Sequence, residues 1–275
     1  MPSEANIALD VRSVSYSYEG VSALENLSLQ VAQGERIALI GANGSGKSTL
    51  LRLLAGLAFP QRGEIFFFGV HLTEARLQEK EFFYTFRRRV GVVFQNPDVQ
   101  LFNASVFDEV AFGPLQLGWP KTKVREKVEQ ALEYLDIADL RDRAPHRLSG
   151  GEKKRVALAS VLVTEPEVLL LDEPAASLDP SSQTFVINLL SSWSDGSRTV
   201  VTATHDLDGL ESIADRCFVL SQGAVAAQGR PLQVLHDVQL LQQIGLIRPH
   251  LHVHESRPAE PHPHLHAGDD PFIAP

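Results

Sequence analysis

The sequence predicts an α/β fold in which strands and helices are arranged around a phosphate-binding loop. Residues 41–48 match the pattern G-x-x-x-x-G-K-S/T at every fixed position. Strands that suit a parallel sheet are expected at 37–40, 90–94, 168–171 and 199–204. Apolar and aromatic residues nearly alternate over 7–31, which is typical of a small, mostly antiparallel sheet. These three observations predict the fold class.

The loop at 41–48 connects a strand to a helix, as phosphate-binding loops do. Its glycines let the backbone wrap around a phosphate, and the N–H groups at the start of the following helix face the anion. Lys47 is expected to neutralise the β- and γ-phosphates, and Ser48 to ligate Mg²⁺. The residues expected to bind nucleotide here are Gly41, Asn43, Gly44, Ser45, Gly46, Lys47, Ser48 and Thr49.

Composition excludes several classes of protein. The formal net charge of -9 argues against general binding to nucleic acid backbones. The one cysteine, Cys217, excludes an internal disulfide and suits a reducing compartment. No run approaches the ~18 apolar residues of a membrane span, and residues 1–4 lack the features of a signal peptide. We therefore expect a cytoplasmic protein whose membrane contacts go through a partner.

The first half of the chain alternates strands and helices. Turns are expected at 19–20, 33–35 and 60–63, and the helix after the loop should end near Gly56. A strand is expected at 64–69 and partly helical structure at 71–89. Gln95 lies directly after the strand expected at 90–94, and an irregular loop is expected at 96–102. Residues 103–147 have a helical pattern, with one apolar face formed by Val124, Val128, Ala131 and Leu135.

The second half places polar residues at strand ends. Residues 148–152 precede a helix from about 153 to 163. The strand 168–171 is followed by Asp172 and Glu173, and the strand 199–204 by His205. A hairpin is expected at 217–228 and a closing helical segment at 231–247. The proline-rich residues 248–275 are expected to form a disordered tail.

Taken in order, these motifs resemble the ATP-binding subunit of ABC transporters over roughly residues 7–230. Tyr18 matches the aromatic residue that stacks on adenine, 41–48 the Walker A loop, and Gln95 the Q-loop glutamine. Residues 148–152 match the LSGGQ signature, with Glu152 in place of glutamine. The remaining matches are Walker B with its glutamate (168–173), the D-loop (177–179) and the switch histidine, His205.

The resemblance implies a P-loop NTPase (RecA-like) core with an N-terminal antiparallel β subdomain and an inserted α-helical subdomain. The ATPase domain would span 1–247, with the helical subdomain at about 96–165. Residues 93–98, 100–102 and 110–114 are similar to the ATPases of energy-coupling-factor importers, most of all those for cobalt and nickel. The same motor in a vitamin importer is the nearest alternative. A DNA-repair or chromosome ATPase and a metal-storage protein are more distant ones.

The resemblance also implies a role for each matched residue in ATP hydrolysis. Ser48 and Asp172 would hold Mg²⁺, and Glu173 would act as general base for the attacking water. Gln95 would contact the metal or this water and report the nucleotide state to the partner, and His205 would hold the γ-phosphate and orient the water. The helix start formed by Ser149, Gly150 and Gly151 would face the γ-phosphate bound by a second ATPase subunit.

These roles imply several partners. The chain would form a homodimer, or a heterodimer with a similar ATPase. It would dock through the Q-loop and 96–147 on a transmembrane coupling subunit that works with a membrane cargo-binding subunit. It would lie peripherally on the cytoplasmic face of the membrane, with no nucleic acid partner.

The tail contains six of the ten histidines in two His-x-His-x-His runs. Imidazole suits Ni²⁺, Co²⁺, Zn²⁺ and Cu²⁺, so a transition-metal site is expected there. The other reading is a solvated tail of biased composition. The candidate ligands are His250, His252, His254, His262, His264 and His266.

Overall fold

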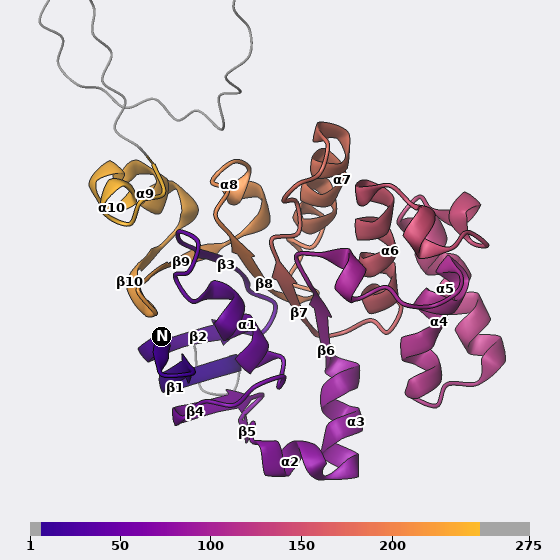
Figure 1. Ribbon diagram of the computed structural model, residues 1–275, viewed down its shortest axis with the longest axis horizontal. Helices are drawn as coiled ribbons and strands as arrows, with labels where there is room; N and C mark the ends of the chain where they lie inside the picture. Colours follow the sequence, from indigo (N-terminus) through magenta and orange to yellow (C-terminus); the bar gives the residue numbers. More distant parts are fainter. Residues whose placement is uncertain (1–6, 248–275) are drawn as a thin grey trace, which may run out of the picture.

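A six-stranded sheet forms the centre of the protein (Figure 1). The computed structural model describes residues 7–247. The strands lie in the order β10-β9-β3-β8-β7-β6, and every neighbouring pair is parallel except β9 and β10. Their bounds are β3 (Arg36–Ile40), β6 (Val90–Val93), β7 (Val168–Asp172), β8 (Thr199–Thr204), β9 (Arg216–Ser221) and β10 (Ala224–Gly229).

A second, four-stranded sheet is antiparallel and has the order β2-β1-β4-β5. The strands β1 (Ile7–Tyr18) and β2 (Val21–Ala32) flank the predicted turn at 19–20. The strand expected at 64–69 is β4 (Arg62–Phe67), which begins two residues earlier because Arg62 pairs with Ser15. The short β5 (Val70–His71) completes the sheet. The predicted antiparallel sheet is confirmed.

Alternate residues of the central strands belong to two different cores, one on each face of the sheet. Ile37 and Leu39 of β3 pack with the antiparallel sheet and α1 (Lys47–Leu54). Ala38 and Ile40 belong to the core that the helices cover on the opposite face. Both sets are fully buried, which explains why β3 has no polar face.

The helices lie on several sides of the two sheets (Figure 1). The helices α4 and α5 lie at the opposite end of the molecule from α9 and α10. Their bounds are α2 (Glu74–Gln78), α3 (Lys80–Arg89), α4 (Val106–Gln116), α5 (Lys121–Tyr134), α6 (Gly150–Leu162), α7 (Pro180–Ser191), α8 (Leu210–Ile213), α9 (Pro231–His236) and α10 (Val238–Gln243). Short 3-10 turns occur at Pro97–Val99, Ala138–Leu140 and Pro145–Arg147.

The region 103–147 is less continuously helical than its pattern predicts. It contains α4 and α5, separated at Gly118 by a left-handed turn that glycine tolerates. After α5 only the two 3-10 turns remain. The predicted apolar face of α5 is buried and packs into the helical core.

The helix predicted from about 153 begins at Gly150, three residues earlier. Ser149 caps it, and Glu152 completes a capping box by accepting from the Ser149 backbone N–H. The predicted hairpin is β9–β10, and the predicted closing segment contains α9 and α10. Across residues 7–247, every helix is too short or too polar to cross a bilayer.

Candidate nucleotide site

Many of the predicted site residues lie at or just after the carboxyl ends of four parallel strands. The loop 41–48 follows β3, Gln95 follows β6, and His205 follows β8. Glu173 follows Asp172, the last residue of β7. The register brings these ends level, because Ile40 pairs with Thr204 and Asp172 with Ala203. Ligands of open parallel sheets bind at this edge.

The phosphate-binding loop leads into α1 without a side-chain cap. Gly46 is the N-cap residue, with a φ of 106°, and among residues 7–247 the helix start has no side-chain cap hydrogen bond. A β-carbon at Gly46 would lie 2.7 Å from the carbonyl oxygen of Ala23 and 2.7 Å from Leu24. Both the backbone angle and the space therefore require glycine. The N–H groups at this helix end can bind an anion.

Lys47 is buried in the loop. Its Nζ donates to the carbonyl oxygens of Gly41 at 2.7 Å and Ala42 at 3.2 Å. Burial lowers the pKa of Lys47, and the charges of Glu173 and Asp172 oppose that shift. A cation held against backbone carbonyls is well placed to exchange these bonds for phosphate oxygens.

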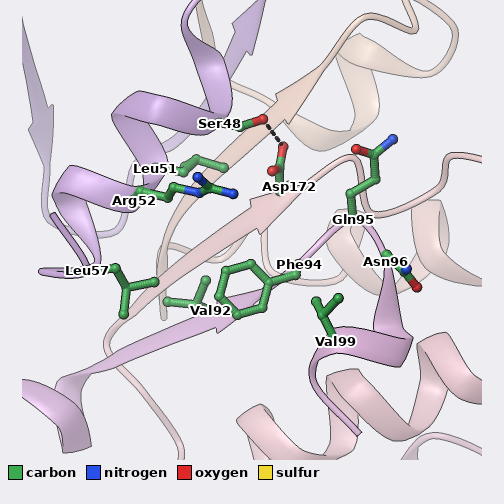
Figure 2. A pocket seen from close by; sticks show the side chains of 10 residues that line it. All are labelled: Ser48, Leu51, Arg52, Leu57, Val92, Phe94, Gln95, Asn96, Val99 and Asp172. Carbon is green, nitrogen blue, oxygen red and sulfur yellow. Dashed lines mark hydrogen bonds between the residues drawn. The ribbon is translucent and has the colours of Figure 1, made fainter. Parts of the chain in front are cut away.

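Ser48 and Asp172 lie together in a pocket of about 260 Å³, which Gln95 also lines (Figure 2). Ser48 Oγ donates to Asp172 Oδ1 at 3.1 Å. Burial raises the pKa of Asp172, and the Ser48 hydrogen bond opposes that shift. Hydroxyl, carboxylate and amide oxygens are the ligands that Mg²⁺ prefers, and the cation keeps further positions for water and phosphate. These three residues therefore fit a magnesium ion.

Glu173 and His205 form a contact that the motifs did not predict. His205 Nδ1 lies 2.7 Å from Glu173 Oε1. Glu173 is buried, has a φ of 46°, and its backbone N–H donates to the Ala203 carbonyl at 2.9 Å. His205 is half exposed. A buried carboxylate and a half-exposed imidazole are thus in contact at the carboxyl ends of β7 and β8.

The start of α6 has two glycines in different surroundings. A β-carbon at Gly151 would lie 2.2 Å from Ser182 Oγ, so close packing requires this glycine. A β-carbon at Gly150 would meet nothing within 4 Å. Asp179 caps α7 by accepting from Ser181 and Ser182, and these hydrogen bonds lower its pKa. Packing among residues 7–247 therefore does not explain Gly150, and the open space beside it leaves room for a ligand.

The remaining predicted nucleotide contacts lie on or near the loop. Tyr18 is exposed at the end of β1 and packs edge-to-face on Tyr16, with ring centroids 4.9 Å apart. Asn43 and Gly44 are exposed, and Thr49 is half buried in α1. Ser45 is buried, and its Oγ has no hydrogen-bond partner within residues 7–247.

One residue at this edge was missed by the sequence reasoning. Lys154 of α6 is 1% exposed, and its Nζ donates to the carbonyls of Phe94 at 3.0 Å and Gln95 at 2.9 Å. Its helical spacing could have indicated its burial, because Gly151, Lys154 and Leu158 fall on the buried face of α6.

The histidines expected to bind a transition metal lie outside the described residues, at 250–266. Within 7–247, no group of three or more histidine, cysteine or acidic residues could hold a metal ion. The transition-metal site therefore stays a prediction.

Sequence comparison places residues 24–176 in a family described as ABC transporter. The nickel import ATP-binding protein NikO of Rhodobacter capsulatus is 53% identical over 243 residues, which cover 87% of this chain and 96% of that protein. The energy-coupling factor transporter ATP-binding protein EcfA of Methanothermobacter thermautotrophicus is 42% identical and matches 88% and 76% of the two chains.

Solved structures agree with this assignment and confirm the P-loop fold. One is cbiO1 of Clostridium perfringens, part of the ABC transporter complex cbiONQ. It superposes with a TM-score of 0.74 at 37% identity and covers 88% of this chain and 95% of that one. Another is a dimeric ATP-binding cassette with ADP and Pi, with a TM-score of 0.73 at 25% identity over 81% and 98% of the chains. The chain therefore belongs to the ABC transporter family, as an ATP-binding and ATP-hydrolysing protein of the energy-coupling type related to nickel and cobalt importers.

Proposed function

We propose that this chain is the ATP-hydrolysing subunit of an energy-coupling importer for a transition metal ion such as nickel or cobalt. The 53% identity to a nickel import protein over nearly its whole length carries this proposal. A vitamin importer is the alternative, because EcfA proteins are similar over much of their length and their names state no cargo. A non-transport ATPase is less well supported, since the named relatives are import or transporter proteins.

ATP would bind along the edge of the sheet that the loop 41–48 forms. The exposed ring of Tyr18 offers a face for adenine. The N–H groups that begin α1 receive the phosphates, and Lys47 exchanges its bonds to Gly41 and Ala42 for the β- and γ-phosphate oxygens. Thr49 lies in the first turn of α1, where it can contact the α-phosphate.

Ser48, Asp172 and Gln95 would hold a magnesium ion beside the phosphates. When bound, Mg²⁺ neutralises charge that develops on the β- and γ-phosphate oxygens. Asp172 would bind the ion in its ionised form, although burial alone raises its pKa. The hydrogen bond between Ser48 and Asp172 keeps both oxygens directed into the pocket (Figure 2).

Glu173 would act as the general base for the attacking water. The water oxygen forms a bond to the γ-phosphorus, the bond to the β–γ bridging oxygen breaks, and Glu173 takes the proton. The 2.7 Å contact lets His205 orient this carboxylate. A contact between His205 Nε2 and a γ-phosphate oxygen requires a proton on Nε2, because the phosphate oxygen can only accept.

A second ATPase subunit, either an identical chain or a similar one, would complete the site. The free N–H groups at the start of α6 suit an anion, and the space beside Gly150 admits one. The solved dimer of a related cassette with ADP and Pi supports this arrangement.

A transmembrane coupling subunit would dock on the exposed apolar residues near the Q-loop and α4. Val99 and Phe102 are 70% and 66% exposed, and Phe112 and Leu115 of α4 are also exposed. The rings of Phe102 and Phe112 contact each other, with centroids 5.0 Å apart. Exposed apolar groups of this size are typical of interaction sites. The chain would then lie peripherally on the cytoplasmic face of the membrane, with cargo bound by a separate membrane subunit.

The six histidines at 250–266 would bind the transported metal or a related one. Calorimetric titration with Ni²⁺ and Co²⁺ tests this, by comparing the full chain with a 1–247 truncation. Equal affinity of the two proteins would contradict a metal site in the tail.

The substitution Glu173→Gln tests the proposed hydrolysis. The amide cannot take the proton, so we expect ATP binding to persist, turnover to fall by about a thousandfold or more, and the ATP-bound dimer to accumulate. Phosphate release and size-exclusion chromatography with ATP measure these effects. The control is Glu167→Gln, because Glu167 pairs with Arg89 at the surface. Full turnover by the Glu173 variant would overturn the base assignment.

Cargo is tested separately, by uptake of nickel and cobalt in a strain that lacks the gene for this chain. Restoration by the wild-type chain and not by Glu173→Gln would support metal import. Unchanged metal uptake together with impaired vitamin uptake would favour the alternative.

A further inference from the structure

Two adjacent lysines of α6 have different environments. Lys153 lies near the surface and pairs with Asp98 at 2.7 Å. Lys154 is 1% exposed and ranks among the largest fully buried side chains. Its ammonium donates to the carbonyls of Phe94 and Gln95, the residues that follow β6. Both lysines thus join α6 to the segment that follows β6, Lys153 through an ion pair near the surface and Lys154 through backbone carbonyls inside the protein.

The burial of Lys154 is unfavourable by itself. Desolvation lowers the pKa of Lys154 to about 8, and the charges of Asp172 and Glu173 oppose the shift. An apolar side chain such as methionine would fill similar space without this desolvation cost. The lysine therefore contributes directional bonds to two consecutive carbonyls, which packing alone would not supply.

The side chain of Gln100 also joins this loop to α6. Gln100 Oε1 accepts from the Phe94 backbone N–H at 3.3 Å, and its Nε2 lies 3.3 Å from both the Ala157 carbonyl and Ser160 Oγ. Both ends of the segment 94–100 are thereby held to one helix. The side chain of Gln95 is left free to line the pocket with Ser48 and Asp172 (Figure 2).

We propose that Lys154 is a positioning residue that fixes the backbone of Gln95 to α6, so that the Q-loop and the signature helix move as one body. This inference rests on the proposed function, in which Gln95 contacts one Mg-ATP and the start of α6 contacts another. A shift of α6 at the dimer interface would then displace Gln95 in the chain's own site, because Lys154 connects them.

The test compares Lys154→Met with Lys127→Met, because Lys127 pairs with Glu165, outside the segment 94–100. The Lys127–Glu165 ion pair lies near the surface and contributes little to stability. In the nucleotide-free chain, we expect backbone amides of 94–100 to exchange hydrogen roughly tenfold faster in Lys154→Met only. We expect kcat to fall about tenfold or more while the KM for ATP stays within about threefold. The Mg²⁺ concentration for half-maximal rate should rise severalfold, because Gln95 is no longer positioned.

Each outcome decides the proposal. Wild-type exchange or wild-type kcat in Lys154→Met overturns it, as does an equal loss in ATP affinity, which would mean that Lys154 acts through the phosphate loop. If Lys154→Met does not fold, Lys154→Gln replaces it, since its amide can donate to one carbonyl. An intermediate loss of kcat then supports positioning, and wild-type values overturn it. A wild-type chain that did not hydrolyse ATP would instead contradict the proposed function, while the exchange measurement would still report on the Lys154 contact.

Discussion

Two helices of this protein begin at a proposed phosphate site, and their first turns differ. The first turn of α1 has no side-chain cap and no acidic residue, and it contains the buried Lys47. The first turn of α6 has a complete capping box made by Ser149 and Glu152. The lysines that follow it bond to Asp98 and to the carbonyls of 94 and 95.

In the proposed dimer, this difference would divide one nucleotide site between two chains. The α1 end combines unused N–H groups with a cation, so it can bind an anion unaided. The α6 end keeps a carboxylate in its first turn and offers the N–H groups and open space at Gly150. It is suited to an anion that another subunit already holds. Substitutions at the two ends should therefore affect different measured quantities.

The largest expected effect on nucleotide affinity is at the α1 end. Lys47→Ala removes a buried cation from the β- and γ-phosphates, which costs about 2 kcal/mol or more and weakens ATP binding by roughly thirtyfold or more. Equilibrium titration with ATP and Mg²⁺ measures it. Lys127→Ala is the control, because Lys127 pairs with Glu165 on the surface. Normal affinity in the Lys47 variant would refute the phosphate role.

The next effect should appear in turnover and leave affinity intact. Gly150→Asp places a carboxylate in the open space at the start of α6, where it would repel a partner's γ-phosphate. We expect turnover to fall about a hundredfold, with ATP affinity of the single chain within about twofold. Gly150→Asn is the matched neutral control and should lose much less. An affinity loss like that of Lys47→Ala would contradict the division between chains.

Much of the α1 end could be predicted from the sequence, since a fixed eight-residue pattern specifies the strand, loop and helix together. The strands that deliver Asp172 and His205 were predicted from short apolar runs. Helix boundaries were less accurate. The helical pattern predicted for 103–147 extends beyond the end of α5. The reason is that the 3-10 turn at Ala138–Leu140 also contains apolar residues, of which Leu140 is buried.

Contacts between residues that lie far apart in the chain could not be predicted from the sequence. The pairing of His205 with Glu173 depends on the register of β7 and β8, which no local pattern specifies. The burial of Lys154 depends on how α6 packs against the end of β6, and its sequence neighbour Lys153 is chemically identical. Residue type predicted which groups could react, and tertiary packing determined which of them touch.

A smaller effect should separate capping from function. Ser149→Ala and Ser105→Ala each remove an N-cap hydroxyl, at α6 and at α4, and each should lower the free energy of unfolding by about 1 kcal/mol. Urea titration measures both. We expect turnover to fall only for Ser149→Ala, because the α4 cap is remote from the phosphates. Equal turnover in the two variants would mean that the Ser149 hydroxyl serves stability alone.

The smallest effect concerns Glu152, which stands where the signature pattern has glutamine. Hydrogen bonds from the Ser149 backbone and side chain lower its pKa, with a smaller contribution from Arg143 and Arg155. A carboxyl with a lowered folded-state pKa adds stability above its unfolded pKa, and this is lost as pH falls through the folded pKa. Glutamine keeps the capping box without the charge, so Glu152→Gln should cost only about 0.3–1 kcal/mol at neutral pH.

Urea unfolding of both proteins at about pH 7 and about pH 3 measures this difference in stability, which should shrink on acidification because the wild-type carboxylate becomes protonated. Turnover should stay within about twofold of wild type, because a helix N-terminus that approaches phosphate does not need the negative charge of Glu152. If the stability difference between the two proteins instead grew at acid pH, the carboxylate would be destabilising in the folded protein. The capping hydrogen bonds, and not the charge, would then hold the start of α6 in place.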